Sequence, residues 1–170
     1  MPKSEVLSHS KLICDNFADL PAYKRSTNIA IYSPINNEVD TLEIFKRNLL
    51  DGKNSFFPKV VNNELYFHKI NNLNELETGS FGIQEPVSSI VSSSINDIDL
   101  FIVPGLCFDL NGSRLGYGKG LYDKALKNVS SSKIYAFCYS FQILNDVPSS
   151  NHDKSVGHMV SESGVVSIKI

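Results

Sequence analysis

The hydrophobic and polar positions of the chain form blocks that predict helices and strands in turn. The first block predicts an amphipathic helix that ends at Leu20, just before Pro21. Its apolar residues recur at three- and four-residue spacing: Val6, Leu7, Ile13, Phe17 and Leu20. The chain therefore begins almost inside a helix.

The next two blocks predict a strand followed by a helix. Residues 28–32 form an apolar run rich in β-formers, and the run stops before Pro34, which is typical of a buried strand. Asp40 stands three residues before Glu43, a spacing like that of a capping box, and predicts the start of a helix that ends at Gly52.

The rest of the chain continues the alternation. The patterns predict strands at 55–57 and 65–68 around an Asn62-Asn63 turn, a loop over 71–94, a buried parallel strand at 100–103, a helix from about 120 to 128, and strands at 133–139 and 165–170. Strands that alternate with helices indicate an α/β layered fold with a mainly parallel sheet. No repeat or linker divides it, so residues 1–170 are expected to form a single domain.

Charge and cysteine content narrow the class of protein. The 170 residues include 16 Lys and Arg against 18 Asp and Glu, a formal net charge of −2, which argues against nucleic-acid or membrane partners. No apolar run approaches the roughly 18 residues of a membrane span. Cys14, Cys107 and Cys138 form no C-x-x-C pair, so we expect a reduced, cytoplasmic protein. We also expect a monomer or a weak dimer.

A glycine-rich segment follows the buried strand at 100–103. Four of the ten glycines lie between Gly112 and Gly120, with Arg114 and Lys119 among them. Glycine lets backbone N–H groups converge on an anion, so this segment predicts a phosphate-binding loop. It matches neither the Walker A nor the G-x-G-x-x-G pattern, and a simple strand-to-helix turn is the alternative. Asp123 either complements the helix N-terminus or binds Mg²⁺ beside a phosphate.

The same segment resembles a known family. The runs Val103-Pro-Gly-Leu-Cys-Phe-Asp109 and Gly112-Ser-Arg-Leu-Gly-Tyr-Gly-Lys-Gly-Leu-Tyr-Asp123 resemble the signature of the 5-formyltetrahydrofolate cyclo-ligases, also called methenyltetrahydrofolate synthetases. Shorter matches follow the family's order from residue 4 to residue 168, and they comprise residues 37–41, 57–59, 82–86 and 152–153.

The resemblance implies a fold, an activity and a mechanism. The fold is a three-layer α/β/α sandwich with a Rossmann-like, mainly parallel sheet. The activity is the ATP- and Mg²⁺-dependent closure of 5-formyltetrahydrofolate to 5,10-methenyltetrahydrofolate, with release of ADP and phosphate. In the family's mechanism the formyl oxygen attacks the γ-phosphate, N10 attacks the activated carbon, and phosphate departs. Phosphorylation turns a poor leaving group into a good one, so the protein mainly aligns its substrates and stabilises charge.

The resemblance also implies roles for individual residues. Arg114 and Lys119 would be catalytic, countering phosphate charge, and Asp123 and Asp153 would hold Mg²⁺. The folate would contact Glu38, Phe81, Tyr117 and Tyr122. ATP would bind the loop formed by Arg114, Leu115, Gly116, Tyr117, Gly118, Lys119, Gly120, Leu121 and Tyr122. Without the resemblance, Glu38 would be a solvated helix cap, Asp153 a loop acid, and the aromatic residues ordinary core.

Two departures from the family pattern bear on function. Leu121 occupies a position where the family commonly has an aromatic residue, which alters one wall of the folate site. Family members also usually carry a further N-terminal helix, whose Lys and Arg reach the ATP phosphates, and the expected domain lacks it. A non-catalytic member that binds nucleotide or folate is therefore the alternative to an active cyclo-ligase.

Overall fold

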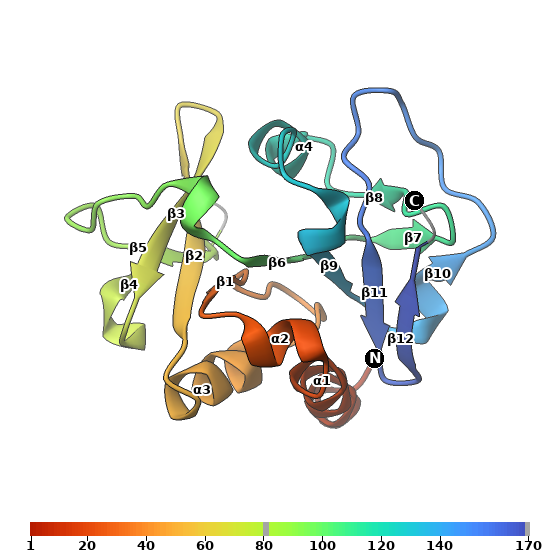
Figure 1. Ribbon diagram of the computed structural model, residues 1–170, viewed down its shortest axis with the longest axis horizontal. Coiled ribbons are helices and arrows are strands. Elements are labelled where there is room, and N and C mark those ends of the chain that lie inside the picture. Colours follow the sequence, from red (N-terminus) through yellow and green to blue (C-terminus); the bar gives the residue numbers. More distant parts are fainter. Residues whose placement is uncertain (80–81, 169–170) are drawn as a thin grey trace.

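A computed structural model describes residues 1–79 and 82–168 of the chain (Figure 1). Within these residues the largest sheet has seven strands. They are β1 (Asn28–Ala30), β2 (Asn54–Val61), β3 (Glu64–Ile70), β6 (Leu100–Val103), β9 (Ile134–Phe137), β11 (His158–Ser161) and β12 (Gly164–Ser167). Their order is β12-β11-β9-β6-β1-β2-β3. The five inner strands run parallel, and the two edge strands pair antiparallel.

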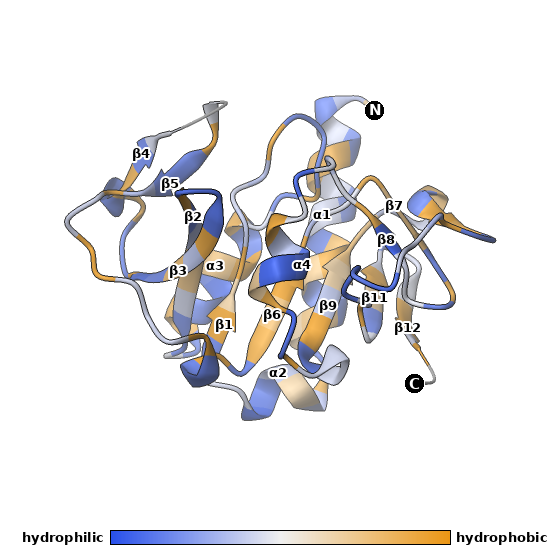
Figure 2. Cartoon of the chain, turned by 90° about the horizontal axis from the view of Figure 1, so that it is seen from above, coloured by the Kyte–Doolittle hydropathy of each residue, from blue (hydrophilic) through white to orange (hydrophobic). Residues whose placement is uncertain are grey.

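Helices cover both faces of this sheet. Helices α1 (Lys3–Ala18), α2 (Pro21–Arg25) and α3 (Leu42–Leu50) lie on one face, and the short α4 (Leu121–Ala125) lies on the other (Figure 1). The central strands β6 and β9 are buried along their length, and β1 is buried after Asn28 (Figure 2), as expected for strands covered on both faces. The predicted α/β/α sandwich with a mainly parallel sheet is confirmed.

Aromatic packing holds the first helical layer on the sheet. Phe17 of α1 is fully buried and makes edge-to-face contacts with Tyr23, Tyr135 and Phe137 at ring-centroid distances of 5.4, 5.3 and 5.3 Å. Such pairs favour this geometry because the positive ring edge meets the negative ring face. Val6, Ile13 and Phe17 of the predicted apolar spacing are therefore on the buried side of α1, whereas Leu7 is exposed.

Several element boundaries differ from the sequence prediction. Helix α1 ends at Ala18, and Pro21 starts the unpredicted α2, because proline fits the first position of a helix. The predicted capping box does not form: Thr41 is the N-cap of α3, and Asp40 Oδ1 accepts a hydrogen bond from the Leu42 N–H at 2.9 Å. The helix predicted over 120–128 is limited to α4. The predicted last strand corresponds to β12, but its antiparallel partner β11 was not predicted from the sequence.

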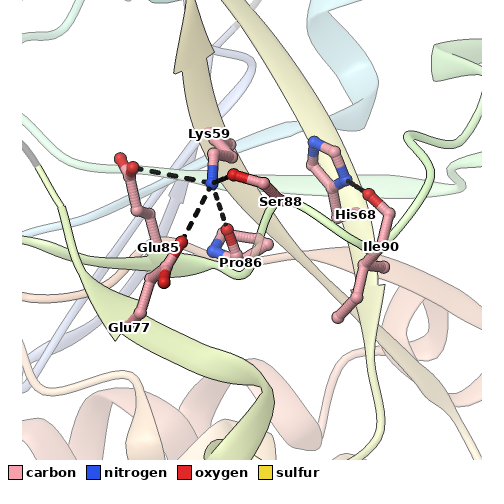
Figure 3. Close-up of polar contacts among 7 residues, drawn as sticks. All are labelled: Lys59, His68, Glu77, Glu85, Pro86, Ser88 and Ile90. Atoms are coloured by element: carbon pink, nitrogen blue, oxygen red, sulfur yellow. Dashed lines mark hydrogen bonds and ion pairs between the residues drawn. The ribbon is translucent and has the colours of Figure 1, made fainter.

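The predicted loop over 71–94 contains a small hairpin of β4 (Leu76–Thr78) and β5 (Gln84–Pro86). Lys59 of β2 joins this hairpin to the main sheet (Figure 3). Its ammonium donates hydrogen bonds to the Pro86 carbonyl at 2.6 Å and to Ser88 Oγ at 3.1 Å. It also forms ion pairs with Glu77 at 3.4 Å and Glu85 at 3.8 Å.

The strand order marks one edge of the sheet as the expected ligand site. From β1 the chain adds β2 and β3 on one side and later β6, β9 and β11 on the other, so the order reverses between β1 and β6. Open α/β sheets bind ligands beyond the carboxyl ends of the strands at such a point. A second sheet, of β10 (Ile143–Leu144), β7 (Cys107–Asp109) and β8 (Arg114–Leu115), follows β6 there.

Among the described residues, no helix is both long and apolar enough to cross a bilayer.

Candidate functional site

The glycine-rich segment forms an exposed loop between β8 and α4. Gly118 and Gly120 have φ angles of 86° and 60°, in the left-handed region that a side chain would strain. A Cβ at Gly116 would lie 3.1 Å from Nη1 of Arg114, so glycine lets the guanidinium lie against the backbone. Lys119 lies on the exposed part of this loop. The glycines therefore set the path of the loop around Arg114.

Arg114 is held firmly at the base of this loop, with its side chain only 8% exposed. Its Nη2 donates to Asp123 Oδ1 at 3.1 Å and its Nη1 to the Pro104 carbonyl at 3.3 Å. The guanidinium also lies over the Tyr122 ring, 5.4 Å from its centroid. These contacts pre-orient a charged, planar donor group, which suits recognition of phosphate oxygens.

Glu38, from the loop after β1, meets the glycine-rich loop across 79 positions of sequence. Its Oε1 accepts a hydrogen bond from the Tyr117 hydroxyl at 3.3 Å, and its Oε2 accepts one from the Ile35 N–H at 2.9 Å. Burial raises the pKa of Glu38, and these two hydrogen bonds offset part of that rise. Burial likewise raises the pKa of Tyr122, so its hydroxyl stays protonated. The predicted folate-facing carboxylate thus lies beside the predicted phosphate loop.

Asp109 fixes the two segments that flank the loop. Its side chain is fully buried, and its Oδ1 accepts from the Asn111 and Ser113 N–H groups, both at 2.9 Å. Its Oδ2 accepts from the Val147 N–H at 3.0 Å. Burial alone would raise the pKa of Asp109, but these hydrogen bonds outweigh it and lower the pKa. The segment that carries Asp153 is therefore tied to the start of the glycine-rich loop.

A cavity of about 460 Å³ opens beside α4, between Asp123 and Asp153. Asp123 Oδ1 accepts from Arg114 and from the Lys154 N–H at 3.0 Å, and Asp153 Oδ2 accepts from the Ser150 N–H at 2.6 Å. Within residues 1–79 and 82–168, the other oxygen of each carboxylate accepts no hydrogen bond. Among the described residues, no group of three or more His, Cys, Asp or Glu could hold a metal. The pair therefore fits Mg²⁺ shared with phosphate oxygens and water, because Mg²⁺ commonly uses one or two carboxylates.

The structure brings most of the predicted site residues to one edge of the sheet. The loop from Arg114 to Tyr122, with half-buried Leu121, connects Glu38 on one side to Asp123 on the other. Asp153 joins them across the cavity. Phe81 lies outside the described residues. The functional roles of these residues stay predictions.

Three lysines that line the same cavity are not among the predicted site residues. Lys124 and Lys127 project from α4 and the segment after it, and Lys154 directly follows Asp153. Their sequence signal is weak, since lysines at three-residue spacing usually mark a solvated helix face. The adjacency of Lys154 to a predicted metal ligand is the one feature that could have drawn attention to it.

The fold and the site define a class of protein. A mainly parallel α/β sheet carries a glycine-rich loop with a fixed arginine at its switch point, and acids flank the loop, an arrangement typical of enzymes that bind nucleotide phosphates. Residues 1–162 match the model of the 5-formyltetrahydrofolate cyclo-ligase family. The chain belongs to this family.

Individual relatives agree with this assignment. The chain is 31% identical to the mouse 5-formyltetrahydrofolate cyclo-ligase, over 96% of this chain and 87% of the mouse protein. It is 30% identical to a probable 5-formyltetrahydrofolate cyclo-ligase of Schizosaccharomyces pombe, over 94% of this chain and 86% of the yeast protein. The NMR structure of the Aquifex aeolicus 5,10-methenyltetrahydrofolate synthetase superposes with a TM-score of 0.88 at 35% identity, covering 100% of this chain and 86% of that one.

Proposed function

We propose that this chain is an ATP-dependent ligase that closes 5-formyltetrahydrofolate to 5,10-methenyltetrahydrofolate and releases ADP and phosphate. The reaction needs a folate and a nucleotide phosphate side by side. The observation that carries the proposal is the hydrogen bond between Tyr117 and Glu38, because it joins a carboxylate suited to pterin N–H donors to the glycine-rich loop. The relatives described above are named for the enzyme, which favours catalysis over the binding-only alternative.

Each residue has a role in this reaction. Glu38 accepts hydrogen bonds from the pterin and orients the formyl group, and Tyr117 and Tyr122 line the boundary between folate and phosphate. The loop amides, Arg114 and Lys119 hold the γ-phosphate and offset its charge while the formyl oxygen attacks it. The bond between the γ-phosphate and ADP breaks, and the formyl carbon then carries a good leaving group. N10 attacks that carbon and gives up its proton to water, and inorganic phosphate departs as the ring closes. Alignment and charge stabilisation carry most of the rate enhancement.

Asp123 and Asp153 are the residues that would hold Mg²⁺. When bound, the ion would neutralise phosphate charge during transfer. The Arg114 ion pair and the Lys154 N–H hold the Asp123 carboxylate in the lining of the cavity. A cytoplasmic location stays a prediction from the three free cysteines.

An absorbance assay tests the proposed reaction. Purified protein is mixed with 5-formyltetrahydrofolate, ATP and Mg²⁺, and the methenyl product is followed by its near-ultraviolet absorbance while ADP is quantified. We expect one ADP for each methenyl group formed, and no product when a non-hydrolysable ATP analogue replaces ATP. Folate binding by calorimetry without any turnover at high protein concentration would instead establish the binding-only alternative.

A further inference from the structure

The cavity beside α4 contains more positive charge than the site described above uses. Its lining includes Lys124, Lys127 and Lys154, together with Asp123 and Asp153. Lys124 and Lys127 are exposed, and Lys154 is half-buried. We call these three lysines the lysine wall. Three ammonium groups around one cavity attract an anion to it.

The lysine wall is positioned but not neutralised by the protein. The backbone N–H of Lys154 donates to Asp123 Oδ1, which fixes this residue beside the loop of Arg114. Among residues 1–79 and 82–168, no carboxylate forms an ion pair with any of the three ammonium groups. By contrast, Lys11, Lys46 and Lys59 each have an acidic partner.

We propose that the lysine wall binds the polyphosphate of ATP, an assignment that rests on the proposed function. A lysine ammonium is a compact point charge that binds phosphate oxygens well. Arg114 and the Lys154 N–H both donate to Asp123 Oδ1, so the wall lies next to the acid that Arg114 holds. Lys124, Lys127 and Lys154 are then additional nucleotide-binding residues.

The acids in the cavity decide between two anionic occupants. The carboxylates of a folate's glutamate tail are also oligoanionic and would be attracted to lysines. Asp123 and Asp153 face the same space, however, and would repel a carboxylate tail. A polyphosphate brings a divalent cation that both carboxylates can bind, so the same acids favour it. The mixed charge of the lining therefore selects phosphate.

Direct binding tests the lysine wall without turnover. Calorimetry with inorganic tripolyphosphate and Mg²⁺ compares the wild type with the triple variant Lys124→Gln, Lys127→Gln and Lys154→Gln. Loss of three cationic contacts is expected to weaken binding by about tenfold or more. The matched control, Lys46→Gln with Lys69→Gln and Lys133→Gln, removes equal charge away from the cavity and should change affinity by no more than about twofold. Equal losses in both variants would overturn the proposal.

Steady-state kinetics provides the second test. The triple variant should raise the KM for ATP by about tenfold or more and leave the KM for 5-formyltetrahydrofolate monoglutamate and its triglutamate unchanged. A selective loss of triglutamate affinity would assign the wall to the folate tail and overturn the proposal, as would unchanged kinetics. If the wild type forms no methenyl product, the proposed reaction fails, and tripolyphosphate binding still decides the role of the lysines.

Discussion

Glu38 is a buried acid whose charge state bears directly on its proposed role. Burial raises its pKa above the ordinary value of 4.5, and the bonds from Ile35 and Tyr117 lower it only in part. A carboxylate accepts hydrogen bonds at both oxygens, whereas the protonated acid offers a donor in place of one acceptor. The raised pKa therefore moves the loss of pterin binding toward neutral pH.

We predict that folate affinity falls as the pH drops from neutrality toward 4.5, earlier than an unperturbed Glu would allow. Calorimetric titration with 5-formyltetrahydrofolate in the absence of ATP measures this without turnover. Glu38→Gln should bind 5-formyltetrahydrofolate more weakly at neutral pH, and its affinity should no longer fall as the pH drops. Tyr117→Phe removes a hydrogen bond that lowers the pKa of Glu38, so its folate affinity should begin to fall at a higher pH. If the affinity of Glu38→Gln still fell at acidic pH, the titrating group would be a residue other than Glu38.

Arg114 illustrates why an arginine stands in a chain that mostly uses lysine. Its two terminal nitrogens donate at once to the Pro104 carbonyl and to Asp123, and its face covers the Tyr122 ring. An ammonium has neither the fork nor the planar face needed to make all three contacts. Sequence placed Arg114 in the phosphate loop, but its internal contacts depend on Pro104 and on the turn of α4.

At the scale of elements, one side chain of the main sheet makes most of the polar contacts that hold the β4–β5 hairpin. Lys59 is 11% exposed, and its ammonium contacts both strands of the hairpin and the segment that follows (Figure 3). The hairpin is short, and isolated two-stranded hairpins are marginal in water. Its attachment therefore combines the packing of Leu76 against the core with the hydrogen bonds and ion pairs of one nearly buried ammonium.

We predict that Lys59→Met loosens the hairpin while the main sheet stays folded. Losing the cation leaves the half-buried Glu85 and the Pro86 carbonyl without their partner, at a cost of about 1–3 kcal/mol. Hydrogen exchange of residues 75–88 should accelerate, and that of β9 should not change. Lys69→Met, on the exposed side of β3, provides the control. Equal acceleration in both regions would show a general loss of stability instead.

Long apolar strands and turn chemistry were predictable from sequence, and short strands were not. Residues 100–103 form β6 as predicted, and Asn62 and Asn63 take the positive φ angles that a tight hairpin turn requires. Strands β4, β7, β8 and β10 have two or three residues each, too few for a period to show. For β10 the partner is also distant in sequence, since Ile143 pairs with Phe108 of β7. Gln142, just before β10, supports this pairing by donating to the Gly105 and Leu106 carbonyls at 3.0 Å.

At the scale of the whole molecule, the candidate site joins the two halves of the sheet. Glu38 follows β1 and belongs to the half with β2 and β3, whereas the loop of Arg114 follows β6 and belongs to the other half. The family resemblance identified these residues individually. Their contact, and the cavity that adds Lys124, Lys127 and Lys154, depend on the path of the chain around β7, β8 and α4, which no local pattern encodes.

The two-part site predicts how ligands stabilise the fold. A ligand that binds only the folded state raises the free energy of unfolding by about 2.7 kcal/mol at 100 times its Kd. ADP with Mg²⁺ and 5-formyltetrahydrofolate should each raise the Tm, and together they should raise it further because they occupy different halves. Thermal melting followed by circular dichroism measures all three shifts without turnover.

Two variants should separate these shifts. Glu38→Gln is expected to lose most of the folate shift and keep the ADP shift, because Glu38 is proposed to bind the pterin and not the phosphates. Arg114→Lys should do the reverse, since its contacts lie with Pro104, Asp123 and Tyr122. Each variant is compared with its own unliganded Tm, so a change in intrinsic stability does not enter the shift. Loss of both shifts in both variants would contradict a site divided between the halves of the sheet.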